Sequence, residues 1–428
     1  MKRSWPFSAA ANHLAHVKWS IADQALVSGT NFLTGILLVR SMGMSVFGMF
    51  TLAWMLVQFL NNLQTAIITS PMLSIGPKQV AEDRPTYYGA VLAEQLVFST
   101  GSFVFVYTSM ALSQVMFPAS QGELLALPLA TTAATFQLQD FMRRYFFATG
   151  RAASALLNDS ISYLGQLVAI ILLIRLNIVD AVNALWVISV TSGLAAVLGL
   201  CSMQAIAFNF HVSKRVLIRH WHFSKWLLIK THLNQLTTYP LIWALGFFRG
   251  SEAVGILTAC RNVVGVLHVA FLSLDNIIQP RASRVIATEG LETAIRFIQH
   301  ITKWAAIPVI TICLAAAIFP DKLISVFYGN VLVGHEEVLI LFAAAYFLTF
   351  LEKPFSYVLL ALEKTRTLAI VDGVKFLISI TLCIPIVQSY GTTGVMALVV
   401  FLNLSGIAIL LNGCAKSVSS HLDGLKPA

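Results

Sequence analysis

The chain has 428 residues, of which 57% are hydrophobic and only 11% are charged, and its formal net charge is +9. Soluble domains carry about 25% charged residues, so this composition excludes a water-soluble globular protein and predicts that lipid surrounds most of the surface. The basic residues lie in short segments between apolar runs, a pattern typical of topology signals and lipid-phosphate contacts and not of nucleic-acid binding.

Twelve apolar segments are long enough for a membrane-spanning helix, which needs roughly 20 residues. In chain order they cover residues 20–40, 46–72, 87–111, 123–147, 152–174, 181–208, 226–248, 252–279, 297–319, 336–362, 367–388 and 393–415. The connections are short, the longest outer one running from Pro320 to Glu336, and none would hold a soluble domain. We therefore expect an all-α integral membrane protein.

The distribution of basic residues supports this number of spans through the positive-inside rule. With the N-terminus in the cytoplasm, 19 Lys and Arg residues lie inside, Arg143 and Arg144 among them. Only four lie outside, namely Arg40, Arg175, Arg249 and Lys322. A missed span would invert every later segment and destroy this bias, so we predict that both termini are cytoplasmic.

The longest basic connection, His211–Trp226, lies between the sixth and seventh spans. We predict that it joins two six-helix lobes, residues 1–208 and 226–428, through a cytoplasmic linker over residues 209–225. The linker is either an ordinary basic loop or an interfacial helix with three cations that reach lipid headgroups, Lys214, Arg215 and Arg219.

A short phrase occurs twice, as VFGMFTLA over Val46–Ala53 and as AVGILTAC over Ala253–Cys260. Each copy follows one apolar segment and opens the next, and a fixed long offset indicates a duplicated unit. Because each lobe has an even number of spans, the two lobes form a parallel repeat about an axis along the membrane normal. We predict that Gly48 and Gly255 form tight outer turns that let the first two helices of each lobe pack closely.

Two segments resemble bacterial polysaccharide flippases of the Wzx type, which belong to the superfamily of multidrug, oligosaccharidyl-lipid and polysaccharide exporters. The first, LVRSMGMSVFGMFTLAW, is similar to the R-x-L-G-x-x-x-F-G-x-F pattern near the start of these proteins, with Met42 in place of the usual leucine. The second, FFATGR over Phe146–Arg151, resembles their turn between the fourth and fifth helices. The resemblance extends in architecture over essentially the whole chain.

This resemblance implies a two-lobed, V-shaped bundle in the bacterial inner membrane that alternates between inward-open and outward-open forms. It implies transport of an undecaprenyl-diphosphate-linked oligosaccharide from the cytoplasmic to the periplasmic leaflet, for exopolysaccharide, O-antigen or capsule. It further implies a glycan polymerase and chain-length machinery as partners, no cofactor, and H⁺ or Na⁺ as a coupling ion. Twelve spans argue against the lipid II flippase branch, which usually has fourteen.

Ionisable residues inside spans are costly and usually face a cavity or a partner. We predict that Arg261, the deepest cation of its span, binds the diphosphate, because guanidinium binds phosphate by a two-pronged fork. The alternative is an ion pair between Arg261 and Asp23 or Asp275. Lys230 and Lys303 are further substrate-binding candidates, unless they extend to the membrane interface instead.

Two other lysines lie next to acids in the sequence. Lys353 follows Glu352 and precedes Pro354, where a kink would hold both charges, and Lys375 lies three residues from Asp372, which permits a same-face pair on a helix.

Asp23, Glu94 and Asp159 lie on the first, third and fifth spans of the first lobe. In the related drug exporters, acids on helices one and five are associated with proton or sodium coupling, so the resemblance implies this role for Asp23 and Asp159. We add Glu94 as a third ion-coupling candidate. The alternative is that Asp23 and Asp159 are solvated near the cytoplasmic surface or cap helices.

Helix breakers at similar depth in the first helix of each lobe predict hinges. They are Gly29 and Gly35 in the first span and Pro240 in the seventh, in addition to the repeat glycines Gly48 and Gly255. The alternative for such small residues is close helix packing.

Five scattered cysteines without a CxxC spacing, together with His220 and His222 that have no nearby Cys or carboxylate, predict neither disulfides nor a metal site. Two alternative functions remain. A cation-coupled multidrug antiporter of the same superfamily would favour acids and aromatic residues over a basic cavity. A membrane-embedded glycan polymerase would need a large periplasmic loop or clustered His and Asp residues, and we expect no enzyme.

Overall fold

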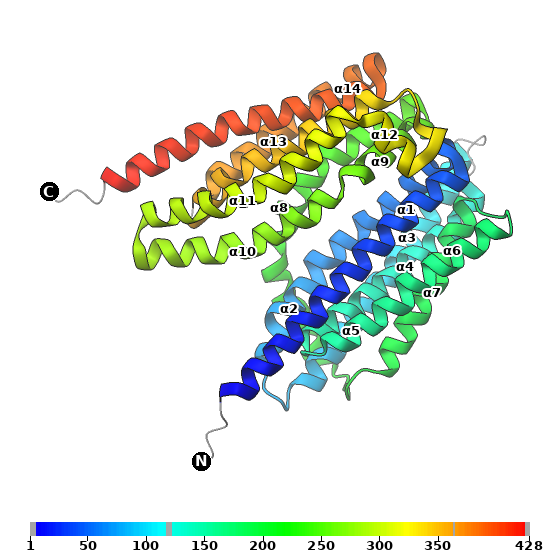
Figure 1. Cartoon of the computed structure of the whole chain (residues 1–428). Helices are drawn as coiled ribbons and strands as arrows, with labels where there is room; N and C mark the ends of the chain where they lie inside the picture. Colours follow the sequence, from blue (N-terminus) through cyan, green and yellow to red (C-terminus); the bar gives the residue numbers. More distant parts are fainter. Residues whose placement is uncertain (1–5, 117–121, 363, 424–428) are drawn as a thin grey trace. The chain divides into compact units, whose positions relative to one another are not determined.

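The computed structural model describes residues 6–116, 122–362 and 364–423, and within these ranges every regular element is helical (Figure 1). The chain forms two compact units. Unit 1 comprises Met1–Met42 and Met49–Thr231, and unit 2 comprises Gly43–Gly48 and His232–Ala428. In the described part, seven helical stretches are long and apolar enough to cross a membrane, or eight if one bent pair is a single span.

Unit 1 contains both arms of α1 (Pro6–Gln64) except Gly43–Gly48, followed by a π-helical turn at Thr65–Thr69. Next come α2 (Ser70–Ile75), a 3₁₀ turn (Gly76–Lys78), α3 (Arg84–Met116), α4 (Gly122–Ala148) and α5 (Ala152–Asp159). A second π-helical turn (Ser160–Leu164) leads to α6 (Gly165–Arg175), α7 (Ala181–Cys201) and the first part of α8 (Phe210–Arg249). Helix α4 packs between α3 and α7, and its buried Phe141, Met142 and Tyr145 form the core with Tyr87 and Tyr88 of α3.

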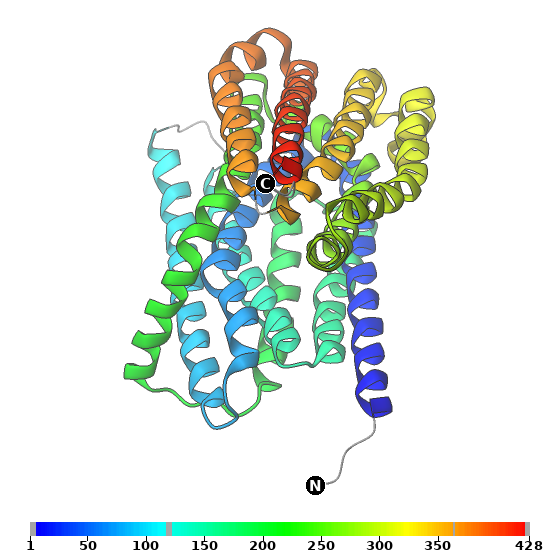
Figure 2. The ribbon, with the colours of Figure 1, turned by 90° about the vertical axis from the view of Figure 1, so that its left-hand side faces the viewer.

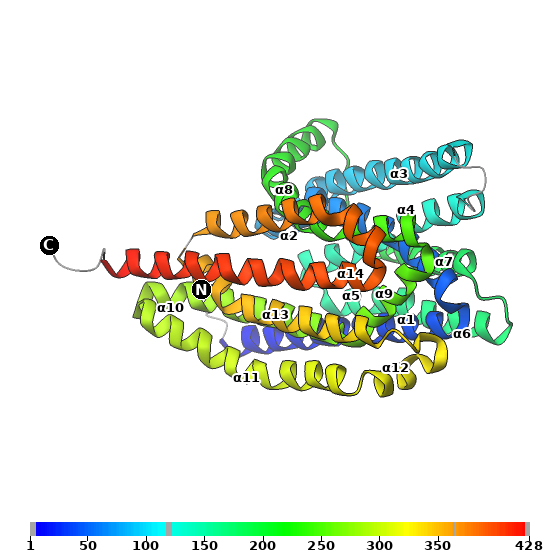
Figure 3. The same cartoon turned by 90° about the horizontal axis from the view of Figure 1, so that it is seen from above.

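Unit 2 contains the rest of α8, α9 (Ser251–Val264), α10 (Val266–Glu289), α11 (Leu291–Ile318) and α12 (Pro320–Tyr328). A 3₁₀ turn (Gly329–Leu332), α13 (Glu336–Ala361) and α14 (Thr365–Asp423) follow. Figure 2 and Figure 3 show that α14 folds back on itself, so that its orange and red arms lie side by side. Helix α13 packs against α14 and α11, around buried Tyr357 and Ile298.

The predicted all-α membrane-protein fold is confirmed, and each of the twelve predicted spans lies on a described helix or pair of helices. Helices α1 and α14 are each long enough for two crossings, and a single glycine divides each of them. Gly43 has φ 75° and Gly391 has φ 55°, values that glycine adopts without strain. Helices α9 and α10 are the bent pair, with a bend of 53° at Gly265, and together they are apolar and long enough for one span.

Two predicted segments differ from the structure. The sixth span ends at Cys201, and residues 202–209 are not helical. The outer connection from Pro320 to Glu336 contains α12, which begins with a proline at its first turn and buries Ile324 and Tyr328. A proline is favourable there because the first backbone N–H groups of a helix have no partner inside the helix.

The linker predicted over residues 209–225 is helical. It is the first part of α8, and this helix continues without interruption through the predicted seventh span. Val216, His220 and Ser224 recur every fourth residue and are buried against unit 1, which explains why this basic segment is not a solvated loop. The Ser224 hydroxyl donates a hydrogen bond to the Ile67 carbonyl at 3.2 Å.

The turns of the repeated phrase lie five residues before the predicted glycines. Gly43 (φ 75°, ψ 168°) and Gly250 (φ 85°, ψ 168°) carry the turn in the two copies, with nearly identical backbone angles. The prediction of turns at Gly48 and Gly255 is therefore wrong. The matching glycines at 43 and 250 stand at the same offset in the sequence and are the signal that marks the true turn.

Gly48 and Gly255 instead allow two helical segments of unit 2 to touch. A Cβ atom on Gly48 would lie 1.7 Å from the Ser251 carbonyl oxygen, and one on Gly255 would lie 2.2 Å from the Met44 carbonyl oxygen. The predicted close packing is real, but it joins residues 43–48 to the start of α9 and not the first two helices of one lobe.

Candidate functional site

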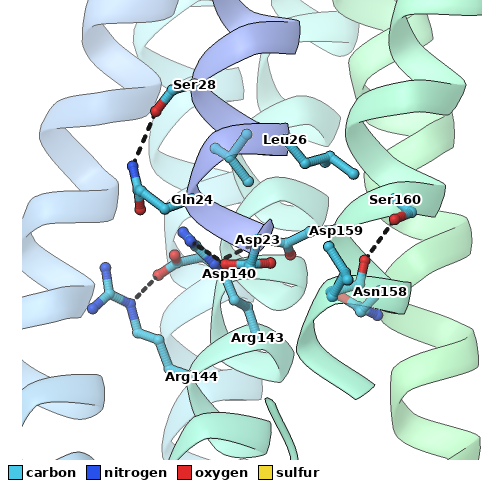
Figure 4. Close-up of polar contacts among 12 residues, drawn as sticks. Asp23, Gln24, Leu26, Ser28, Asp140, Arg143, Arg144, Asn158, Asp159 and Ser160 are labelled. Atoms are coloured by element: carbon cyan, nitrogen blue, oxygen red, sulfur yellow. Dashed lines mark hydrogen bonds and ion pairs between the residues drawn. The ribbon is translucent and has the colours of Figure 1, made fainter. Parts of the chain in front are cut away.

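A buried charge centre lies inside unit 1, where Arg143 of α4 reaches Asp23 of α1 and Asp159 of α5 (Figure 4). The Arg143 Nη2 atom is 2.7 Å from Asp23 Oδ2, and its Nε atom is 2.7 Å from Asp159 Oδ2. The two acidic side chains are 1% and 0% exposed, and that of Arg143 is 18% exposed. Buried charges require such partners, because removing an ion from water costs several kcal/mol.

Neutral polar groups complete this centre. Gln139 donates a hydrogen bond to Asp159 Oδ1 at 2.7 Å, and the neighbouring Asn158 donates one to the Ala195 carbonyl at 2.6 Å. Asp23 Oδ1 is buried and accepts no hydrogen bond from any described residue. With both carboxyl groups ionised, two negative charges face one guanidinium, so the centre has the capacity to take up one further positive charge. A π-helical turn begins directly after Asp159, and such turns are frequent at functional sites.

This geometry corrects three sequence-based alternatives. Asp23 pairs with Arg143 and not with Arg261, and neither Asp23 nor Asp159 is solvated or caps a helix. Arg143 does not lie in a cytoplasmic loop but in α4, whereas Arg144 pairs with Asp140 one helical turn away at 2.7 Å. The structure brings Asp23 and Asp159 together, and their role in ion coupling stays a prediction.

Glu94, the third ion-coupling candidate, belongs to a different group of side chains. Its Oε2 atom lies 2.8 Å from Nδ1 of His220, and the Tyr87 hydroxyl lies 3.0 Å from Nε2 of the same ring. The His220 side chain is fully buried, so both ring nitrogens have their partners inside unit 1. Glu94 therefore contributes to the attachment of α8 to α3.

Unit 2 encloses a polar cavity of about 400 Å³ between α8, α10, α13 and α14. Its charged lining residues are Asp275, Glu352, Lys353, Asp372 and Lys375. Lys353 Nζ lies 2.7 Å from Asp275 Oδ2, the Tyr357 hydroxyl donates to Asp275 Oδ1 at 2.7 Å, and Lys375 Nζ lies 2.6 Å from Glu352 Oε1. The two lysines are thus held by ion pairs between helices.

These contacts replace the local charge pairs expected from the sequence. Lys353 reaches across to α10 and does not share a kink with Glu352, because α13 continues through Pro354 to Ala361. Lys375 selects Glu352 on α13, not Asp372 on its own helix. Gly406 leaves the space for this pair, since a Cβ atom there would lie 2.3 Å from Lys375 Cε.

A second cavity of about 210 Å³ adjoins the first, because Thr238, Thr349, Val399 and Asn403 line both. Most of its wall is apolar, and Arg261 and His268 are the basic residues that line it. Arg261 forms no hydrogen bond or ion pair with any described residue, and Asp275, its other proposed partner, is occupied by Lys353. Arg261 is therefore a cation that faces a membrane-embedded cavity without a described counter-charge.

The remaining candidates are less informative. The Lys230 side chain lies outside the described residues, and Lys303 is exposed on α11 and lines neither cavity. Gly29 and Gly35 lie in a regular helical part of α1, and Pro240 lies inside α8. Their hinge roles stay predictions.

No protein-family model matches the chain, and no curated protein matches its sequence. Solved structures do match. The inward-facing conformation of a multidrug resistance MATE family transporter of the MOP superfamily has a TM-score of 0.74 and 14% identity, covering 95% of this chain and 100% of that one. The lipid II flippase MurJ in an inward closed conformation has a TM-score of 0.66 and 14% identity, covering 93% of this chain and 87% of that one.

A third match is a MOP superfamily transporter from Pyrococcus furiosus, described as having a binding pocket of reverse polarity that suggests a different function. It has a TM-score of 0.52 and 13% identity, covering 97% of each chain. At such low identity the three matches establish the fold alone. The chain has the fold of MOP superfamily membrane transporters.

Proposed function

We propose that the protein is a MOP superfamily flippase of the Wzx type. It moves an undecaprenyl-diphosphate-linked oligosaccharide from the cytoplasmic to the periplasmic leaflet of the bacterial inner membrane, for the synthesis of a surface polysaccharide. The observation that carries this proposal is Arg261, a cation without a described counter-charge that faces a cavity in unit 2. The MurJ match supports it, because that protein is a lipid II flippase.

In this proposal Arg261 binds the diphosphate through two parallel N–H donors, which suit phosphate oxygens better than a point charge does. The adjoining polar cavity offers hydroxyl, amide and carboxylate groups to the sugar rings. The buried centre at Arg143 couples this movement to an ion, since uptake of one H⁺ or Na⁺ at Asp23 or Asp159 would balance its charge. Alternating inward-open and outward-open forms expose the cavity to the two leaflets in turn.

A multidrug antiporter is the second candidate, favoured by the apolar wall around Arg261 and by the MATE family match. Phe271, Phe342 and Tyr346 in that wall would suit a lipophilic compound. An exposed guanidinium in the same wall would repel a cationic drug, however, whereas it attracts a diphosphate. We therefore favour the lipid-linked substrate.

A clean deletion of the gene should abolish export of the surface glycan and cause its lipid-linked repeat to accumulate. The repeat should remain in the cytoplasmic leaflet, because moving the charged diphosphate headgroup unaided through the apolar core of the membrane is very costly. Glycan staining and mass spectrometry of extracted lipids check both effects, and a plasmid copy of the gene should reverse them. Unchanged glycan together with increased drug sensitivity would instead support the antiporter.

Replacement of Arg261 by alanine should reduce glycan export by about 10- to 100-fold, because a charge-assisted hydrogen bond contributes roughly 1.5–3 kcal/mol. Arg261→Lys should recover part of the loss, since lysine keeps the positive charge but lacks the two parallel N–H donors of the guanidinium group. The matched control is Arg296→Ala, which removes an exposed arginine that pairs with Glu292 on the surface of α11. Export that stays normal in both Arg261 variants, at equal expression, would rule out this cation as the phosphate ligand.

A further inference from the structure

The first part of α8 carries a strongly basic surface with no acidic residue nearby in the sequence. Residues 181–251 contain neither Asp nor Glu. We define the basic face of α8 by its exposed residues Lys214, Arg215, Leu217, Ile218, Arg219 and Trp221. Cations and large apolar side chains both lie on this face, and Leu217, Ile218 and Trp221 are 52%, 49% and 55% exposed.

The opposite side of the same helix is fixed to unit 1. Val216 packs into the core of α3 and α4, and His220 is held between Glu94 and Tyr87. Residues 216, 220 and 224 form one stripe because neighbours four apart share a helix face. The basic face therefore points away from the core of unit 1 and keeps a defined orientation relative to it.

Two arginines elsewhere in the described chain have acidic partners within their own helices. Arg144 pairs with Asp140, and Arg296 pairs with Glu292. Lys214, Arg215 and Arg219 form no ion pair with any described residue. Positive charge is thus left unbalanced on the basic face of α8.

We propose that the basic face of α8 binds the phosphate headgroups of anionic phospholipids at the membrane surface. Helix α8 continues without a break into the predicted seventh span, so this face lies next to the point where we expect the chain to enter the bilayer. Lys214, Arg215 and Arg219 contact the phosphates, while the exposed apolar side chains insert between the acyl chains. An acidic protein or a nucleic acid would satisfy the cations but leave Trp221 and Leu217 in water.

The test uses the full-length protein in neutral detergent micelles with phosphatidylglycerol and phosphatidylcholine, and native mass spectrometry measures which lipid stays bound. The wild type should prefer phosphatidylglycerol. The variant K214Q/R215Q/R219Q should lose about 100-fold of this preference, because each cation near an anionic surface contributes roughly a fivefold factor. The control K78Q/R281Q/K364Q removes three exposed but scattered cations and should retain the preference.

A second measurement needs no variant. High salt should remove the preference of the wild type, because the screening length falls from about 10 Å at 0.1 M to about 3 Å at 1 M. Equal retention of both lipids by the wild type, or an unchanged preference in K214Q/R215Q/R219Q, would overturn the proposal. Displacement of phosphatidylglycerol by inorganic phosphate, under conditions where chloride of equal ionic strength leaves the lipid bound, would do so as well, by identifying a site for the free ion. None of these readouts involves glycan transport.

Discussion

Replacement of Arg143 by methionine will lower the free energy of unfolding by about 3–5 kcal/mol, the usual effect of removing one partner from a buried ion pair. The loss is large because the Arg143 guanidinium forms ion pairs with two carboxylates at once, each with an N–O distance of 2.7 Å. Asp23 and Asp159 would remain in the interior, 1% and 0% exposed, without a positive charge. Thermal unfolding of the detergent-solubilised protein, followed by circular dichroism, measures the change.

Two further variants test whether the loss of stability comes from the unpaired buried charges or from the change in side-chain size. Arg144→Met removes an arginine whose pair with Asp140 is partly exposed, and it should cost only about 1 kcal/mol. The triple variant D23N/R143M/D159N removes the whole set of charges and should regain most of the stability, while glycan export, if it depends on this centre, stays lost. A protein that keeps its wild-type melting temperature after Arg143→Met would show that the centre does not stabilise unit 1.

Gly48→Ala is expected to destabilise the protein by about 1–3 kcal/mol or more, the range for adding atoms to a tightly packed contact. Its new methyl group would fall 1.7 Å from the Ser251 carbonyl oxygen, and backbone cannot move aside as the end of a flexible side chain can. Gly255→Ala should act similarly through the Met44 carbonyl, 2.2 Å away.

Gly101→Ala is the matched control, because a Cβ atom at Gly101 in α3 has no neighbour within 4 Å. It should be neutral or stabilising by up to about 1 kcal/mol, since alanine favours a helix more than glycine does. The melting temperatures of Gly48→Ala, Gly255→Ala and Gly101→Ala, measured under the same conditions, test this prediction. Similar values for Gly48→Ala and Gly101→Ala would contradict the close contact.

The spans were predictable because hydropathy over about 20 residues is a local property that the bilayer imposes directly. Helix α8 shows where this reasoning stops. From the sequence alone, its basic first part resembles a loop. In the structure it is a packed helix, because Val216, His220 and Ser224 form a buried stripe against unit 1. A four-residue spacing of a valine, a histidine and a serine is too weak a pattern to predict this.

The charge partners were not predictable, because they depend on contacts between distant segments. Asp23 and Arg143 are 120 positions apart, and Lys353 and Asp275 are 78 apart. Counting Arg143 as a cytoplasmic residue was consistent with the charge bias, yet its place in the last turns of a predicted span was the sign of a buried role. Arg261 was identified from its depth alone, and its cavity required the structure.

The contact made by the repeated phrase has a consequence for the origin of the chain. Gly48 lies against Ser251, and Gly255 lies against Met44. Gly255 corresponds to Gly48 in the two copies of the phrase, and Ser251 corresponds to Met44. Exchanging the two copies therefore converts one contact into the other. Such reciprocity is the mark of an isologous interface, the kind found in homodimers with twofold symmetry. A half-length ancestor with one copy of the phrase would make this contact between two identical chains, and fusion of two such copies would turn a subunit interface into an internal one.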